Sequence, residues 1–206
     1  MNKKSNRWYI EHLNEDFSYS LRLKRVIYTG QSEFQHIDII ETIPFGKTLI
    51  LDGKTQSSES DEYIYHELLV QPALHSLDKV QNVFIAGGGE GATAREVLYH
   101  NSVKSITMLD LDEEVVKLCK QYLPNHHKGS FEDKRMTLIY EDALTYLSST
   151  NETYDLIIID IPDTIFKKLT KKTIKMIINK SLGLYELLLP NNLMQKRNSI
   201  ESNNNA

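Results

Sequence analysis

Four acidic residues of this sequence stand at places where their carboxylates could act together. Glu90 lies inside a glycine cluster, and Asp110, Asp142 and Asp160 each end a segment typical of a buried strand. The carboxyl ends of parallel strands form the ligand crevice of an α/β sheet, so we expect the four side chains to converge there. Crowded carboxylates are unfavourable unless a cation or sugar hydroxyls neutralise them. They therefore predict a site for a positively charged ligand that carries a sugar.

The glycine cluster belongs to a strand, turn, helix and strand pattern. An apolar run at 83–86 leads into Gly87, Gly89 and Gly91, a helical pattern follows, and a second apolar strand ends at Asp110. Glycines allow a sharp turn and let a nucleoside lie against the backbone. An acid at the tip of the next strand can accept hydrogen bonds from both ribose hydroxyls. The pattern predicts a nucleoside pocket, with a purely structural glycine turn as the alternative.

Glu90 limits which nucleosides can bind, because its carboxylate faces the substituent attached to the ribose. A dinucleotide would place its pyrophosphate there and be repelled, which disfavours NAD and FAD. A ligand with a cationic arm would be attracted instead.

The elements that must position these residues begin with a small β region at 8–61. Its segments alternate between apolar and polar residues, and KTLILDGKTQSS is typical of a hairpin that turns at Asp52 and Gly53. The edge strands would be exposed in a monomer. We therefore expect this region to pair with another subunit, giving a homodimer or a larger homo-oligomer.

A central α/β region is expected from residue 62. The period changes at Ser60, and YIYHELLVQPALHSL is typical of a helix capped by that serine. Tyr65 and His66 lie on this helix, where packing is the ordinary role of such side chains. The later patterns predict a helix at 113–122, a loop at 124–130, a strand that ends at Asp142, a helix at 144–148 and a strand at 154–160.

The segment after Asp160 gives weaker signals. One or two helices are expected at 164–190, no strong strand is recognisable there, and the Asn/Ser-rich segment 191–206 is expected to be disordered. We expect an α/β fold with a Rossmann-like parallel sheet of the S-adenosylmethionine-dependent transferase type, truncated in its C-terminal part, and a small N-terminal antiparallel β domain. The expected boundaries are 1–61 for the β domain, 62–190 for the nucleoside-binding domain and 191–206 for the tail.

The composition limits the class of protein. The chain has 206 residues and is 40% hydrophobic, which is enough for a real core. Its net charge is −4, and Lys and Arg are scattered apart from a cluster at 167–175, so we expect no nucleic-acid partner. No apolar run has the length of a leader or a membrane span, and the single cysteine, Cys119, fits a core position in a reducing compartment. We expect a cytoplasmic protein without a membrane partner.

Several segments resemble one known family. GGGEGATARE, FQHIDIIET, FGKTLILDGKTQSSESDEYIYHE and YDLIIIDIPD resemble, in the same order, the polyamine aminopropyltransferases, or spermidine synthase family. The Glu in the glycine turn and the run ATARE look most like the thermospermine synthase branch. The resemblance covers roughly residues 8–163.

The resemblance implies a reaction and a set of ligand contacts. The family transfers the aminopropyl group of decarboxylated S-adenosylmethionine to an amine such as putrescine or spermidine. The products are methylthioadenosine and spermidine, spermine or thermospermine. By analogy with the family, Asp110 would bind the ribose, and Asp142 with the Ala143 backbone would bind the adenine. Gln35 and His66 would contact the sulfonium side of the nucleoside or the bound amine. Glu90 would bind the amine of the aminopropyl arm.

The same resemblance implies a catalytic group. Asp160 would be the general base, Asp163 would hold the acceptor amine, and Tyr65 would assist. A base is needed because an alkylamine titrates near 10.4, so only about one molecule in a thousand is unprotonated at neutral pH. Sulfonium is already a good leaving group, so neither a metal nor a further cofactor is expected.

The chain departs from the family after Asp163. The next residues are Thr164-Ile165-Phe166-Lys167-Lys168, and the later strands that close over the acceptor amine are not recognisable. Two alternatives therefore stay open: a homologue that binds the nucleoside with little or no turnover, and an S-adenosylmethionine-dependent methyltransferase. Glu90 argues against the second, because it would repel the carboxylate of S-adenosylmethionine. The sequence leaves the acceptor amine undetermined.

Overall fold

The computed structural model describes residues 6–161, 175, 177 and 179–184. Its N-terminal part is an antiparallel sheet of β1 (Trp8–His12), β2 (Ser18–Gln31), β3 (His36–Thr42), β4 (Gly46–Leu51) and β5 (Lys54–Ser58), paired in chain order. The β4–β5 hairpin turns at Asp52 and Gly53, whose φ angles of 48° and 73° suit a two-residue hairpin turn. The predicted antiparallel region and its hairpin are confirmed.

The second sheet is parallel throughout. It contains β6 (Asn82–Gly87), β7 (Ser105–Asp110), β8 (Met136–Tyr140), β9 (Tyr154–Asp160) and β10 (Ser181–Leu184), in the order β10-β9-β6-β7-β8. The strand order reverses between β6 and β9, so the chain leaves these two neighbouring strands in opposite directions. A crevice at the carboxyl ends of such strands is the usual ligand site of this fold. The Rossmann-like fold class is confirmed.

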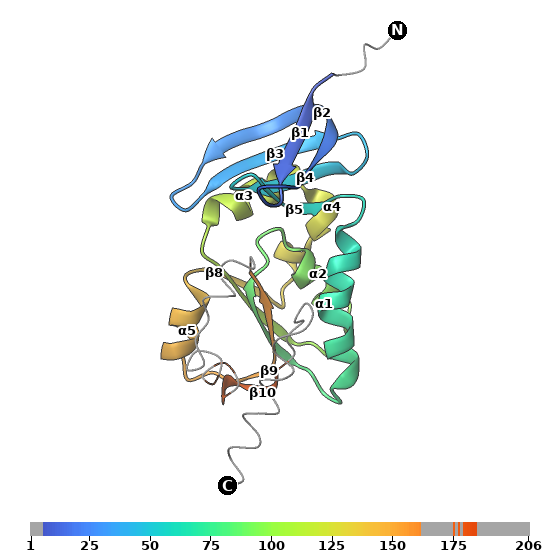
Figure 1. Cartoon of the computed structure of the whole chain (residues 1–206). Coiled ribbons are helices and arrows are strands. Elements are labelled where there is room, and N and C mark those ends of the chain that lie inside the picture. The colour runs from blue at the N-terminus through green and yellow to red at the C-terminus, as the bar shows by residue number, and fades with distance from the viewer. Residues whose placement is uncertain (1–5, 162–174, 176, 178, 185–206) are drawn as a thin grey trace.

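Helices cover both faces of the parallel sheet (Figure 1). On one face, α1 (Glu62–Ser76) and α2 (Ala92–Leu98) pack into a core with β6, β7 and β9, while α5 (Ala143–Ser149) packs on the other face. Helix α3 (Glu113–Tyr122) lies beneath the antiparallel sheet, where its Val115, Leu118 and Cys119 contact Ile37, Ile39 and Leu49. This apolar contact holds the antiparallel sheet over the carboxyl edge of the parallel one.

The short strand β10 follows Asp160, where the sequence predicted no strong strand. Helical residues at Lys175, Ile177, Asn179 and Lys180 precede it, in agreement with the predicted helix, and the chain then pairs with β9 over Ser181–Leu184. A run of only four residues that includes a glycine gives almost no periodic signal, so the sequence pattern missed it. Asp163, the pair Lys167 and Lys168, and the tail 191–206 lie outside the described residues.

Three local predictions were also wrong. Segment 124–130 is not simply a loop, because it contains the short helix α4 (Pro124–His127), with proline in its first turn, and the start of a 3₁₀ turn at Ser130–Glu132. Ser60 does not cap α1, whose N-cap is Asp61 without a side-chain cap hydrogen bond. Strand β8 ends at Tyr140, so Asp142 follows the strand and instead caps α5 by accepting a hydrogen bond from the Thr145 backbone N–H at 2.7 Å.

Among the described residues, no helix is long and apolar enough to cross a membrane.

Candidate active site

A cavity of about 970 Å³ opens at the carboxyl edge of the parallel sheet. Its floor comes from the turns after β6, β7, β8 and β9, and its roof comes from the antiparallel sheet, with residues such as Gln35 and Leu49. Among the residues that line it are Gly87, Gly89, Glu90, Asp110, Asp142, Ala143, Asp160 and Tyr65. The predicted convergence of the four acids is confirmed.

The glycine turn brings backbone where side chains would not fit. A Cβ on Gly87 would lie 2.0 Å from the backbone oxygen of Asp160, and Gly87 and Gly88 have φ angles of +82° and +81°. A Cβ on Gly89 would lie 2.7 Å from Asp110 Oδ2. Gly91 is the N-cap of α2, has a left-handed backbone conformation and packs against Phe131. It therefore lies behind the cavity and does not line its wall. The turn thus puts β6, Asp110 and Asp160 in close contact.

Asp110 sits at the end of β7 with one fixed contact, from the Asp112 backbone N–H to Asp110 Oδ1 at 2.9 Å. Its burial and the charges of Glu90, Asp112 and Asp160 raise the pKa of Asp110 to about 6. The surrounding carboxylates therefore disfavour ionisation of Asp110, and hydroxyl donors from a ligand would stabilise its ionised form.

Asp160 ends β9 and is oriented by two hydroxyl groups. Tyr65 donates to Asp160 Oδ1 at 2.9 Å, and Thr93 donates to Asp160 Oδ2 at 2.5 Å. Burial and the charge of Glu90 raise the pKa of Asp160, although His66 and the two hydroxyls oppose that shift. A carboxylate held in place with a raised pKa is suited to accept a proton.

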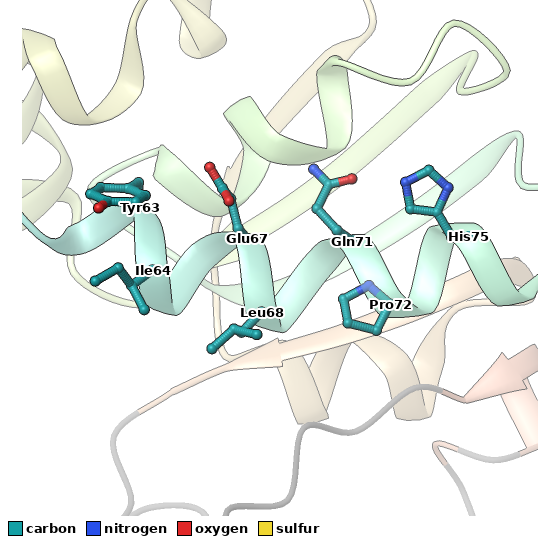
Figure 2. Close-up of a pocket in the computed structure, with 7 residues that line it drawn as sticks. All are labelled: Tyr63, Ile64, Glu67, Leu68, Gln71, Pro72 and His75. Carbon is teal, nitrogen blue, oxygen red and sulfur yellow. The ribbon is translucent and has the colours of Figure 1, made fainter.

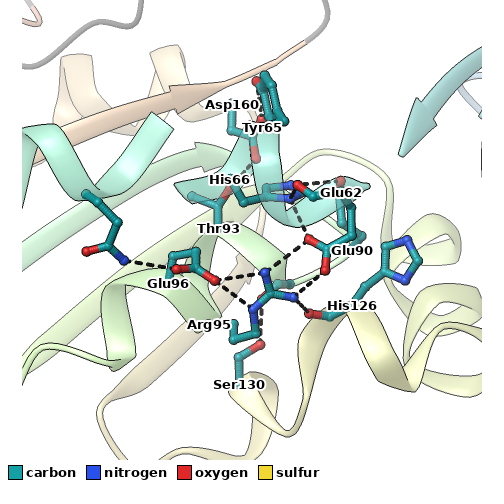
Figure 3. A network of polar contacts seen from close by, with 12 residues as sticks. Glu62, Tyr65, His66, Glu90, Thr93, Arg95, Glu96, His126, Ser130 and Asp160 are labelled. Atoms are coloured by element: carbon teal, nitrogen blue, oxygen red, sulfur yellow. Dashed lines mark hydrogen bonds and ion pairs between the residues drawn. The ribbon is translucent and has the colours of Figure 1, made fainter. Parts of the chain in front are cut away.

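His66 does not line the cavity but lies directly behind it. The imidazole is fully buried, with Nε2 3.3 Å from Glu90 Oε1 and Nδ1 2.8 Å from Glu62 Oε2 (Figure 3). The contact with Glu90 is an ion-pair distance without the geometry of a hydrogen bond. Burial would lower the pKa of His66, but Glu62 and Glu90 outweigh it and raise the pKa to about 10.

The remaining predicted residues lie at the rim. Gln35 is held by its Nε2, which donates to Asp112 Oδ2 at 2.9 Å, and Asp112 in turn caps α3. Asp142 and Ala143 line the cavity at the start of α5. Asp163 lies outside the described residues, so its predicted contact with the amine stays a prediction. Among the residues that the structure does describe, no cluster of His, Cys, Asp or Glu is arranged to hold a metal ion.

Several polar residues around the cavity were missed by the sequence analysis. Glu62, Arg95 and Glu96 form a buried charged group behind His66, and Asp112 anchors Gln35. A helical pattern shows which face is apolar, but it does not show that α2 is buried on every side. The clustering of charged residues in ATARE and DEYIYHE was the available signal.

A second hollow of about 550 Å³ lies on the outer face of α1 (Figure 2). Ile64, Leu68 and Pro72 form one row along it, and Tyr63, Glu67, Gln71 and His75 form another. None of the predicted site residues that the structure describes lines it. The acid-lined cavity is therefore the candidate active site.

Comparison with known protein families gives two matches that together span most of the chain. Residues 7–59 match the family model described as the spermidine synthase tetramerisation domain. Residues 62–183 match the model described as the spermine/spermidine synthase domain. Neither description is that of a methyltransferase.

Individual proteins agree with these matches. The chain is 49% identical over 145 residues to polyamine aminopropyltransferase 2 of Pseudomonas aeruginosa, covering 70% of the chain and 42% of that protein. It is 46% identical over 158 residues to the polyamine aminopropyltransferase of Sulfolobus acidocaldarius, covering 77% of the chain and 52% of that protein. The chain thus spans about half the length of these relatives.

Solved structures give the same result. The crystal structure of spermidine synthase from Thermotoga maritima superposes with a TM-score of 0.79 at 32% identity, covering 85% of this chain and 60% of that one. A spermidine synthase in complex with the transition-state analogue AdoDATO has a TM-score of 0.81 at 31% identity, covering 85% and 61%. Together with the matched family models, these likenesses show that the chain belongs to the spermine/spermidine synthase family.

Proposed function

We propose that this protein transfers the aminopropyl group of decarboxylated S-adenosylmethionine to putrescine or spermidine. The observation that carries the proposal is that Glu90, Asp110 and Asp160 line one and the same cavity. A nucleoside with a sulfonium centre and an ammonium arm supplies the positive charge and hydroxyl donors that such a cavity requires. Relatives that share these segments are named polyamine aminopropyltransferases.

Residues at the rim of the cavity bind the nucleoside in this proposal. Asp110 accepts the ribose hydroxyls, and Asp142 with the Ala143 backbone contacts the adenine. Gln35, fixed by Asp112, contacts the nucleoside from the antiparallel sheet. Binding of the cationic ligand would favour the ionised form of Asp110 and counteract its raised pKa.

The chemical step is a displacement at the carbon next to sulfur. The acceptor amine forms a new C–N bond, the C–S bond breaks, and both of its electrons stay on sulfur as methylthioadenosine becomes neutral. The proton of the amine passes to Asp160, which Tyr65 and Thr93 keep oriented. Asp163 holds the amine. Alignment of the amine with the breaking bond supplies much of the rate.

Glu90 selects the decarboxylated ligand. Its carboxylate attracts the ammonium arm, whereas the α-carboxylate of ordinary S-adenosylmethionine would meet like charge. No metal ion or additional cofactor takes part in the proposed step, and decarboxylated S-adenosylmethionine acts as the co-substrate.

We further propose that the protein works as a homo-oligomer assembled through its antiparallel sheet. This sheet exposes apolar side chains, including Trp8 at 53%, Ile10 at 55% and Val26 at 48% of their surface. The same segment matches a model described as a tetramerisation domain, which supports a tetramer as well as the homodimer expected from sequence. The cytoplasmic location stays a prediction.

The test is a product assay on the purified chain with decarboxylated S-adenosylmethionine and a panel of amines. We expect methylthioadenosine release that depends on putrescine or spermidine. Calorimetric binding of methylthioadenosine without any release would instead select a nucleoside-binding homologue without turnover. An absence of both binding and release would reject the proposal.

A further inference from the structure

A row of alternating charges runs through the interior behind the cavity (Figure 3). Arg95 donates two hydrogen bonds to Glu96 Oε1, at 3.0 and 2.8 Å. It donates two more to the Glu62 carboxylate, to Oε1 at 2.8 Å and to Oε2 at 3.0 Å. Glu62 Oε2 lies 2.8 Å from His66 Nδ1, and His66 Nε2 lies 3.3 Å from Glu90 Oε1. The first four residues are almost fully buried, and the row ends at Glu90 on the cavity wall.

The geometry fixes the charge of His66. Its Nδ1 lies 2.7 Å from the backbone oxygen of Glu62 and 2.8 Å from the carboxylate of the same residue, and both groups can only accept hydrogen bonds. A neutral imidazole would then aim the lone pair of Nε2 at the Glu90 carboxylate. An imidazolium with hydrogen on both nitrogens is the form that suits these neighbours. The raised pKa of His66, about 10, agrees with that form.

The imidazolium of His66 gives Glu90 a different pKa from the other acids of the cavity. Burial alone would raise the pKa of Glu90, but His66 outweighs burial and lowers the pKa to about 2. The pKa of Asp110 and that of Asp160 are both raised. Glu90 is therefore ionised throughout the ordinary pH range, while its two neighbours titrate more readily.

No other described group near Glu90 takes the place of the His66 imidazolium as its positive partner. The Tyr65 ring meets His66 edge-on, with ring centroids 5.1 Å apart, and its hydroxyl is already donated to Asp160. His126 lies near Glu90 with neither ring nitrogen hydrogen-bonded within the described part of the chain, and burial lowers the pKa of its ring. Arg95 is occupied by Glu62, Glu96 and the His126 backbone oxygen.

We propose that Glu62 is a positioning residue for the cationic ligand, because it holds His66 as an imidazolium and His66 in turn keeps Glu90 ionised and oriented. The inference deepens the proposed aminopropyl transfer and rests on it for the identity of the ligand. Contact of Glu90 Oε1 with His66 leaves its second oxygen able to accept a hydrogen bond from the ammonium arm. Neutral methylthioadenosine lacks that arm, so its binding does not use the row.

The matched variants are Glu62→Gln and Glu96→Gln. Both remove one buried carboxylate from Arg95, but only Glu62→Gln removes the anion beside His66. We expect Glu62→Gln to weaken binding of decarboxylated S-adenosylmethionine by about tenfold or more, the free-energy equivalent of one pKa unit of lost ion pairing. Methylthioadenosine binding should change by less than about threefold. Glu96→Gln should leave the ratio of the two affinities within about threefold of the native value.

Calorimetry with these two nucleosides separates positioning from general loss of structure. An equal weakening of both ligands in Glu62→Gln would overturn the proposal, because it would show a merely structural role. The same shift in the affinity ratio in Glu96→Gln would overturn it as well, since that residue does not contact His66.

A measurement on the native protein decides the point without a ligand and without relying on a variant that must fold. The ring signals of His66, assigned in the native protein by their NMR correlation to the backbone of that residue, should show an imidazolium up to about pH 9. Titration near 6.5, the ordinary value for histidine, would overturn the proposal. Failure of the native chain to bind either nucleoside would instead contradict the proposed function, while the titration would still report the charge of His66.

Discussion

The cavity acids differ in how readily they ionise, and that difference assigns their tasks. Asp110 and Asp160 are buried beside like charges, so their pKa values are raised, whereas Glu90 is paired with His66 and its pKa is lowered. A group that stays ionised can anchor a ligand cation, and a group that titrates can accept a proton.

Replacement of Asp110 should affect stability and binding in opposite directions. A carboxyl group whose pKa rises on folding lowers stability as pH increases from its unfolded value to its folded value, here from 3.8 to about 6. At about pH 7.5 we expect Asp110→Asn to raise the free energy of unfolding by on the order of 1 kcal/mol. The gain should shrink as the pH is lowered and vanish well below about 4, where both states bind the proton. Methylthioadenosine binding should be lost.

Thermal unfolding across pH and calorimetry on the same variant check this pair of effects. Asp155→Asn is the control, because Asp155 accepts backbone hydrogen bonds from Gln81 and Asn82 at the far end of β9. It should be less stable than the native protein and bind the nucleoside normally. A less stable Asp110→Asn that still bound methylthioadenosine would contradict the account.

Asp160 should matter to turnover far more than to nucleoside binding. We expect Asp160→Asn to lower kcat by about 10²- to 10⁴-fold, the usual range for a lost general base. Tyr65→Phe removes one of the two hydroxyls that orient Asp160 and should lower kcat by about tenfold. The product assay measures both, and methylthioadenosine affinity should stay close to native. Native kcat in Asp160→Asn would remove this residue as the base.

The acids that line the cavity could be predicted from the sequence, but the buried charged group of Glu62, Arg95 and Glu96 could not. Asp110 and Asp160 stand at the ends of apolar runs and Glu90 stands in the glycine turn after another, where the rule for parallel sheets places ligand groups. Arg95 lies in a helical pattern whose exposed-looking charges turn out to be buried between α1 and α4. The pairing of Arg95 with Glu62 depends on tertiary contact, which periodicity does not encode.

At the scale of elements, the glycine turn and the strands beside it act as one unit. Gly89 has no left-handed backbone, so alanine is allowed there by its φ angle, but its Cβ would lie 2.7 Å from Asp110 Oδ2. We expect Gly89→Ala to weaken methylthioadenosine binding by about tenfold or more, because crowding of this kind costs about 1–3 kcal/mol.

Gly53→Ala is the matched control for that substitution. Gly53 has a φ of +73° and open space around it, so alanine there strains the hairpin without touching the cavity. It should lower stability by about 1 kcal/mol and leave nucleoside affinity unchanged. Native affinity in Gly89→Ala would show that Asp110 is not held against this turn.

Long periodic elements were predictable and short ones were not. Strands β7 and β9 and helix α3 end at or within a residue of their predicted positions, since each has a strong apolar period. Helix α4 and strand β10 have only four residues each and depend on their neighbours for stability. The cap of α1 was misassigned because Ser60 and Asp61 both suit an N-cap.

At the scale of the whole molecule, the antiparallel sheet has two roles. Its inner face packs on α3 and supplies the roof of the cavity, and its outer face exposes apolar side chains. Sequence alone predicted the exposed edges and the need for a partner. It did not predict the packing on α3, which joins residues far apart in the chain.

Assembly through this sheet predicts that Ile10→Lys, on the edge strand β1, shifts the protein toward smaller species. Burial of a charged side chain in place of an apolar one should weaken association by on the order of tenfold or more. Sedimentation at several concentrations measures the shift. Ile64→Lys on α1 is the control, since Ile64 is similarly exposed but lies outside the sheet. Equal effects of the two substitutions would place the interface elsewhere.

The central claim is that the acid-lined cavity receives a cationic nucleoside that has lost its carboxylate. The most direct measurement is calorimetric binding of decarboxylated S-adenosylmethionine and of S-adenosylmethionine to the same native protein. The account predicts that the decarboxylated ligand binds more tightly, by about tenfold or more, because only the carboxylated one is repelled by Glu90. Tighter binding of S-adenosylmethionine would contradict the account and favour methyl transfer.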